Sequence, residues 1–126
     1  MSRYTGKRVK NLICYWLPVL IYMALIFYLS SGPGKLPDYK IPHLDKLGHI
    51  VLYGILGLLV FRAFRAGNPS RPAQRAVIFT LVVCVLYGLS DELHQSFVPQ
   101  RQVELLDIVC DGLGALLVSW IFFIRI

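Results

Sequence analysis

The stretch NLICYWLPVLIYMALIFYLSSGPG, from Asn11 to Gly34, contains no charged residue. Its 24 residues exceed the roughly 20 that a helix needs to cross about 30 Å of hydrocarbon. The whole chain is 56% hydrophobic and 16% charged, with a mean hydropathy of +0.62. This composition is typical of an integral membrane protein rather than a soluble globular one.

A cleaved signal peptide is the competing interpretation of this first apolar stretch. Four basic residues precede it and would form the charged region of such a peptide: Arg3, Lys7, Arg8 and Lys10. The apolar run is too long for a signal peptide, however, and no A-x-A cleavage motif follows it. We therefore predict an uncleaved helix, with Pro18 as the candidate position for a kink.

Three shorter uncharged runs follow, of 15, 15 and 13 residues, at Leu47–Phe61, Ala76–Ser90 and Gly112–Ile124. A soluble helical core could be built from such lengths, but the first span and the apolar composition argue against it. Glycine- and proline-rich segments separate the runs. We predict an all-α integral membrane four-helix bundle that forms a single domain over residues 1–126. The expected spans are approximately 12–30, 46–65, 76–96 and 105–124.

The basic residues predict the orientation, because lysine and arginine concentrate in cytoplasmic segments near the ends of spans. Nine lie on one side of the predicted membrane: Arg3, Lys7, Arg8, Lys10, Arg62, Arg65, Arg71, Arg75 and Arg125. Four lie on the other: Lys35, Lys40, Lys46 and Arg101. Both termini are therefore predicted to be cytoplasmic. The net charge of +6 is explained in this way, and no nucleic-acid partner is expected.

All seven acidic residues and all three histidines fall on the extracytoplasmic side of this map. A helix that ends near Arg125 must begin near Leu105, which puts Asp107 and Asp111 inside the outer part of the membrane. Ionisable groups at this depth cost several kcal/mol unless they are paired or hydrated, so they should face the bundle interior or a polar pocket.

Helical spacing predicts that several of these groups converge. Asp45, His49 and Tyr53 are four residues apart and share one helix face. Asp107 and Asp111 do the same on the last span, and Glu92 and Gln95 form a stripe with Gly88 on the third. The predicted ligand-binding set is Asp45, Lys46, His49, Tyr53, Asp91, Glu92, Gln95, Arg101, Asp107 and Asp111.

Three motifs in this order resemble the VanZ-like family of small bacterial membrane proteins, which is named for a protein associated with teicoplanin resistance. They are DKLGH (45–49) with Tyr53, YGLSDELHQSFVPQR (87–101) and DIVCDGLGALL (107–117). The chain departs from the family pattern at Asp111, where Asn is usual, at Gln100, where Gly is usual, and near Val118 or Ser119, where another Gly is usual. The resemblance implies a multi-pass protein of the bacterial cytoplasmic membrane that acts on or near the cell envelope.

Several roles remain open for individual residues. Asp91 is expected to pair with Lys46 or Arg101, while Arg101 suits either an anionic headgroup or a salt bridge to Glu104. Asp107 and Asp111 could pair with Lys46 and Arg101 as structural contacts. His49 and His94 could hold a divalent metal with Asp45, Glu92 and Asp111 as further ligands, but no metal motif is present and no other cofactor is expected. The three cysteines, Cys14, Cys84 and Cys110, lie in apolar runs and are interpreted as packing residues.

These observations support three hypotheses of different classes. The first is a protein that binds an anionic membrane lipid, a lipid-linked cell-wall precursor or a glycopeptide-related ligand at an extracytoplasmic pocket, and so modulates teicoplanin susceptibility. The second is a membrane-embedded hydrolase or transferase for phospholipid-type substrates, with or without a metal, in which Glu92 or Asp111 is the acid/base and His49 a ligand or proton relay. The third is a bundle whose polar groups only specify helix pairing.

Overall fold

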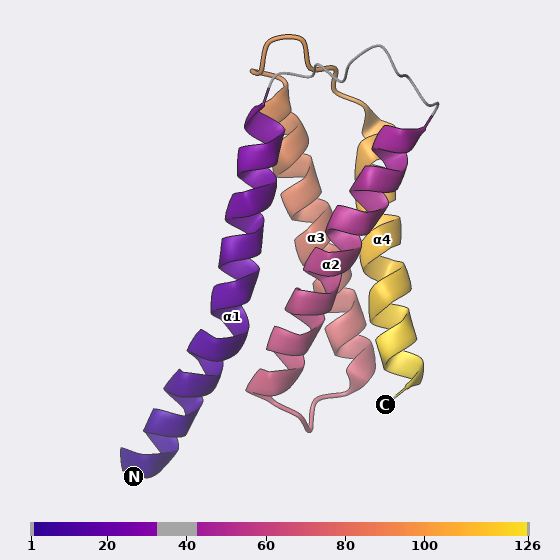
Figure 1. The fold of residues 1–126 in the computed structure, drawn as a ribbon. Coiled ribbons are helices and arrows are strands. Elements are labelled where there is room, and N and C mark those ends of the chain that lie inside the picture. The colour runs from indigo at the N-terminus through magenta and orange to yellow at the C-terminus, as the bar shows by residue number, and fades with distance from the viewer. Residues whose placement is uncertain (1, 33–42, 126) are drawn as a thin grey trace.

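The computed structural model describes residues 2–32 and 43–125, with side chains from residue 5 onward, and over these residues it is entirely helical apart from turns and short connections (Figure 1). The helices are α1 (Ser2–Ser31), α2 (Leu44–Gly67), α3 (Ala73–Gln95) and α4 (Leu105–Ile124). All four are long and apolar enough to cross a membrane. The predicted all-α class with four membrane-length helices is therefore confirmed, and the chain is a multi-pass membrane protein.

The helix ends follow local sequence. Pro72, with φ −55°, stands just before α3, where a missing backbone N–H costs nothing. Asn68 closes α2, and Pro99 lies shortly beyond the end of α3. Gln100 adopts a positive φ of 65°, a backbone conformation that favours glycine, at the position where the family resemblance leads one to expect glycine. Predicted loop residues Lys35, Asp38 and Lys40 lie outside the described part of the chain.

The bundle is held together mainly by α2, which contacts all three other helices and packs most extensively against α4. At this crossing a Cβ on Gly57 would lie only 2.9 Å from the Cα of Ala115, and a Cβ on Gly114 would collide with the carbonyl oxygen of Ile50. Glycine therefore lets the two backbones touch, as small residues do at helix interfaces in membranes. Helix α1 leans away from the other helices towards its N-terminus (Figure 1).

The core is apolar and lies midway along the bundle, while most other large apolar side chains point outward. Leu56, Val60, Cys84 and Ala115 are fully buried there. In contrast, large hydrophobic residues of every helix are exposed, as expected of surfaces that face lipid.

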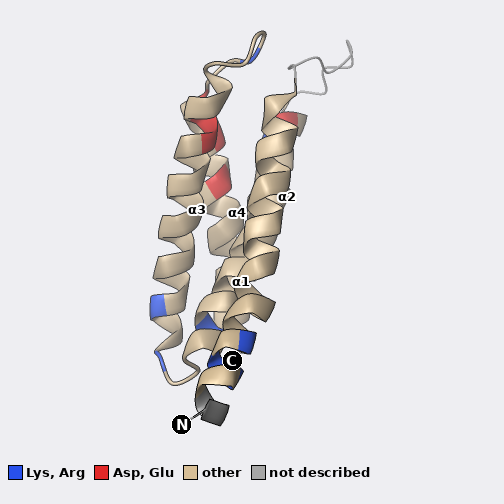
Figure 2. Ribbon diagram, turned by 90° about the vertical axis from the view of Figure 1, so that its left-hand side faces the viewer, with Lys and Arg blue, Asp and Glu red and all other residues tan. Residues whose placement is uncertain are grey.

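The described acidic residues gather at one end of the bundle, and most of the described basic residues lie at the other (Figure 2). We call the end with Leu44, Gln95 and Leu105 the acidic end, because all the described acidic residues lie there. The opposite end, with the start of α1, the α2–α3 connection and Arg125, is the basic end. The structure therefore agrees with the charge segregation that the sequence predicts. The assignment of the basic end to the cytoplasmic side stays a prediction.

Changing Gly114 to Ala tests the close approach of α2 and α4. The added methyl group collides with the Ile50 carbonyl, so we expect the free energy of unfolding to fall by about 1–3 kcal/mol. The matched control is Gly48→Ala on the partner helix α2, where a Cβ would meet no atom within 4 Å. The control should be neutral or stabilising by up to about 0.8 kcal/mol. Reversible unfolding in mixed micelles measures both, and equal stability of the two variants would contradict the described packing.

Candidate functional site

Lys46, near the start of α2, is surrounded by three carboxylates at the acidic end. Its Nζ lies 2.8 Å from Asp45 Oδ2, 2.6 Å from Glu104 Oε2 and 2.6 Å from Asp107 Oδ1. The Lys46 side chain is only 11% exposed, and that of Asp107 is 8% exposed. The predicted pairing of Asp107 with Lys46 is present, and Glu104, which lies outside the predicted ligand set, completes the arrangement. One ammonium group is thus shared among three acids and has little capacity left for a further anion.

His49 lies one helical turn after Lys46 on α2 and joins α2 to α4. Its Nδ1 lies 2.7 Å from Asp111 Oδ1, and its Nε2 lies 3.7 Å from Asp107 Oδ2. When Asp111 is ionised it can only accept a hydrogen bond, so Nδ1 donates to it, and in the neutral imidazole Nε2 then keeps its lone pair. His49 is thereby oriented with one ring nitrogen free towards Asp107 and the centre of the cluster.

Gly88 of α3 makes the space in which the Asp111 carboxylate lies. A Cβ at position 88 would come within 2.5 Å of Asp111 Oδ2, so any side chain there would displace the carboxylate. Asp111 is fully buried, and its Oδ2 has no hydrogen-bond partner among the described residues. The chain thus keeps a carboxylate, rather than the amide usual in the family that it resembles, in a fitted and completely enclosed position.

Glu92 of α3 completes the cluster and is also buried, with 2% of the residue exposed. Its Oε2 accepts a long hydrogen bond of 3.4 Å from the backbone N–H of Glu104, whereas its Oε1 has no partner in the described structure. One ligand atom each from His49, Glu92 and Asp107 lies within 4.8 Å of the other two. Three separate helices therefore bring one imidazole nitrogen and two carboxylate oxygens together, which is a donor set that metal ions use.

Asp91 and Gln95 belong to a second polar cluster, between α3 and α1. Asp91 Oδ2 accepts hydrogen bonds from Ser30 Oγ at 2.7 Å and from Gln95 Nε2 at 3.1 Å. The expected pairing of Asp91 with Lys46 or Arg101 is therefore wrong. Adjacent residues on a helix point about 100° apart, so Asp91 turns towards α1 while Glu92 turns towards α4. Ser30 is not among the predicted site residues, and its contact with Asp91 joins α1 to the bundle.

Arg101 also lies apart from the carboxylate cluster. Its Nε donates to the carbonyl oxygen of Gly32 at 3.1 Å and its Nη2 to that of Leu29 at 3.2 Å. A cation at this position suits the exposed carbonyl groups at the end of α1. Among the described residues Arg101 forms no salt bridge, so the alternative of a salt bridge to Glu104 is wrong. The Glu104 carboxylate pairs with Lys46 instead.

The remaining predicted residues divide between the cluster and its surroundings. The ring of Tyr53 lies below that of His49, with centroids 6.4 Å apart, and is fully buried, with its hydroxyl oxygen unpaired in the described structure. His94 instead stacks on Phe27 of α1 at 4.2 Å. The two histidines are therefore not brought together at one metal site.

Comparison with known proteins agrees with the resemblance seen in the motifs. Residues 15–126 match the VanZ/LLP1 family, and the chain belongs to that family. It is also 33% identical over 97 residues to an uncharacterized protein of the fission yeast Schizosaccharomyces pombe. That match covers 76% of this chain but only 57% of the yeast protein. No solved structure matches.

Replacing Lys46 by Met tests whether the carboxylates depend on this ammonium group. Removing one partner of a buried charge cluster leaves the other charges uncompensated, so we expect a loss of about 3 kcal/mol in the free energy of unfolding. The double variant Lys46→Met/Asp107→Asn removes one of the freed charges and should recover part of that loss. Unfolding in mixed micelles without added metal measures both. A Lys46→Met variant as stable as the parent would contradict the proposed charge balance.

Proposed function

We propose that this VanZ/LLP1 family protein binds a divalent cation between His49, Glu92 and Asp107, and through that cation the phosphate of a membrane lipid or lipid-linked headgroup. A nitrogen donor combined with two carboxylates suits Zn²⁺ or Mn²⁺ better than Ca²⁺ or Mg²⁺, which prefer oxygen ligands alone. The cation would lie near one end of the bundle, at the depth where lipid headgroups meet the hydrocarbon.

The contact between His49 and Asp111 is the observation that carries this proposal. Histidines that bind metals usually donate their second ring N–H to a carboxylate, which fixes the orientation and raises the basicity of the ligand nitrogen. The 2.7 Å contact from Nδ1 to Asp111 has this form, and it leaves Nε2 directed towards Asp107. A neutral side chain would satisfy His49 at lower desolvation cost than the fully buried Asp111 carboxylate, so orienting a metal ligand would give that buried charge a role.

The charge balance gives independent support. Six described carboxylates lie at the acidic end: Asp45, Asp91, Glu92, Glu104, Asp107 and Asp111. The described bases there are Lys46, which three acids already share, and Arg101, which donates to backbone carbonyls. Carboxylates at membrane depth require compensation, and Glu92 has a buried oxygen with no described partner. A dication among His49, Glu92 and Asp107 would supply that compensation.

The same balance changes the way in which an anionic headgroup would be bound. From the sequence alone, Arg101 and Lys46 are the expected contacts for the phosphate. Both are engaged elsewhere in the structure, so a phosphate that approached the carboxylates directly would meet repulsion. A bound dication would convert the same surface into one that attracts phosphate. The lipid-binding hypothesis is therefore retained with a metal, rather than Arg101, as the contact.

A hydrolase or transferase for phospholipid-type substrates is the second candidate. Three protein ligands would leave coordination positions open for substrate and water, as in catalytic rather than structural metal sites. In hydrolysis, water adds to phosphorus and the bond from phosphorus to the lipid oxygen breaks. The chain's own contribution would be Asp111, which holds the His49 proton and orients its ring, while Glu92 and Asp107 fix the charge of the site.

The location and cellular role follow the same line of proposal. With nine basic residues counted on one side against four, the basic end is proposed to face the cytoplasm and the cation site the outer leaflet. Reporters fused to each terminus test this orientation, and an external terminus would refute it.

Placement in a bacterial inner membrane and an effect on teicoplanin susceptibility rest on the family resemblance. The effect on susceptibility would follow indirectly from altered lipid or precursor binding.

Metal stoichiometry tests the cation site. Purified protein stripped with a chelator should bind one equivalent of Zn²⁺ and show a raised thermal midpoint, because a ligand that binds only the folded state stabilises it. His49→Ala and Glu92→Gln should abolish both effects, and Asp111→Asn should weaken affinity about 10- to 100-fold. The matched control is Asp91→Asn, which removes a buried acid that contacts Ser30 and Gln95 rather than the trio. No binding by the parent protein, or equal loss in the control, would contradict the site.

Phosphatidic acid tests the proposed ligand class. Native mass spectrometry should detect a phosphatidic acid adduct whose metal-dependent part disappears with chelator and returns with Zn²⁺. Asp111→Asn should reduce that part in step with its weaker metal affinity. Release of inorganic phosphate from the bound lipid would favour the hydrolase candidate over simple binding. An adduct unaffected by metal would contradict the cation-mediated contact.

A further inference from the structure

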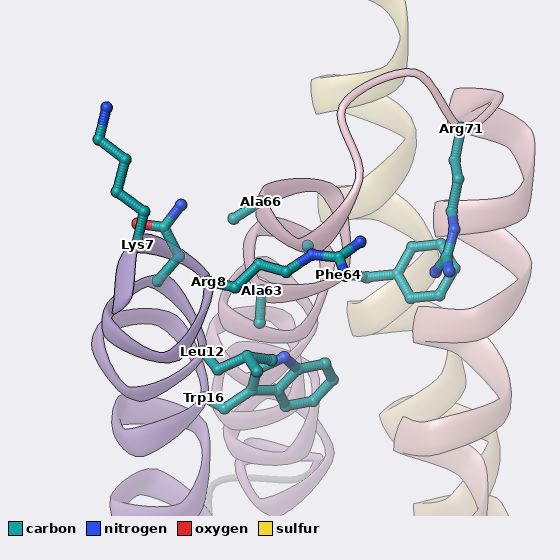
Figure 3. Close-up of a pocket in the computed structure, with 10 residues that line it drawn as sticks. Lys7, Arg8, Leu12, Trp16, Ala63, Phe64, Ala66 and Arg71 are labelled. Carbon is teal, nitrogen blue, oxygen red and sulfur yellow. The ribbon is translucent and has the colours of Figure 1, made fainter. Parts of the chain in front are cut away.

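The basic end contains a pocket of about 440 Å³ between the first turns of α1 and the end of α2 with the connection that follows (Figure 3). Its lining includes Lys7, Arg8 and Leu12 of α1 together with Phe64 and Arg71. From Leu44 to the end of α2 is a rise of about 35 Å, so this pocket lies across the membrane from the carboxylate cluster. It is therefore a separate site from the one proposed above.

The rim of the pocket carries cations without acidic partners. The Arg71 guanidinium lies 5.1 Å from the centre of the Phe64 ring, and Arg8 extends from α1 towards the same ring (Figure 3). Arg65 donates to the Arg71 carbonyl oxygen at 2.7 Å and so holds the connection in place. All described salt bridges lie at the acidic end, and none involves a base of the pocket. The positive charge here is thus available to an anion.

The side of the pocket that faces the middle of the membrane is apolar and aromatic. Trp16 and Ala63 lie below the arginines, and Phe64 stacks on Phe79 with ring centroids 4.4 Å apart. Trp16 meets the same Phe79 edge-on at 6.3 Å. Leu12, which also lines the pocket, is 50% exposed. Cations at the rim and an open apolar wall below them match a phospholipid, in which an anionic phosphate is followed by apolar acyl chains.

We propose that this pocket binds one anionic phospholipid, with its phosphate between Arg8 and Arg71 and an acyl chain along Leu12 and Trp16. Basic pockets between transmembrane helices are suited to anionic headgroups, whose attraction adds to the burial of the chain. Free phosphate would use only the rim and leave the apolar wall unfilled.

Lipid titration by native mass spectrometry of the full chain in mild detergent tests this site. Palmitoyl-oleoyl-phosphatidylglycerol should bind about tenfold more tightly than the zwitterionic phosphatidylcholine with the same chains. The double variant Arg8→Ala/Arg71→Ala should lose this preference, whereas Arg8→Lys/Arg71→Lys should keep most of it because the charge remains. Arg8 and Arg71 are both exposed, and unchanged thermal midpoints verify that the two double variants are folded.

The matched control is Arg75→Ala/Arg125→Ala, which removes two exposed cations from the same end of the bundle without touching the pocket. This control should retain the preference for phosphatidylglycerol, and so should the parent protein in chelator, which separates the pocket from any metal site. Equal loss in the control, or no preference in the parent, would overturn the proposal. Complete displacement of the lipid by excess inorganic phosphate would also overturn it, since the rim alone would then account for binding.

Discussion

The structure depends on one constraint, which is that carboxylates placed inside a membrane must be compensated. Asp107, Asp111 and Glu92 are all buried, and they lie on helices long and apolar enough to cross a membrane. Lys46 offsets the negative charge of Asp107, and the ring of His49 contacts the carboxylate of Asp111. The unpaired oxygens of Glu92 and Asp111 leave the compensation incomplete within the described chain. The proposed cation site would account for both the burial and the remaining charge.

The packing of the bundle serves the same arrangement. Glycines at 57 and 114 let α2 and α4 approach closely, and this proximity carries Lys46 and His49 of one helix to Asp107 and Asp111 of the other. Gly88 brings α3 near enough to enclose Asp111. The cluster is thus built on rigid helices rather than on loops, which is how a site with defined ligand geometry is maintained. The arginine-rich opposite end leaves its cations free for a different partner.

The sequence was sufficient for the helices and for much of the cluster. Apolar runs of membrane length and the four-residue spacings depend only on helix geometry, so the grouping of His49, Asp107 and Asp111 could be predicted. The rotation of α1 against α3 could not, because the adjacent Ser30 and Ser31 point in different directions at the end of an otherwise apolar run and do not single out one face. For this reason the pairing of Asp91 with Ser30 was missed. The path of the chain between α3 and α4 was equally hidden, and it carries Arg101 to the end of α1.

X-ray absorption at the zinc edge would test the central claim most directly, because it reports which atoms surround the metal. Protein loaded with one equivalent of Zn²⁺ should show scattering from a single imidazole together with carboxylate oxygens, and the imidazole contribution should vanish in His49→Ala. A shell of oxygen alone, or a shell unchanged in that variant, would mean that the metal binds elsewhere. The buried carboxylates would then need a source of compensation other than a cation between His49, Glu92 and Asp107.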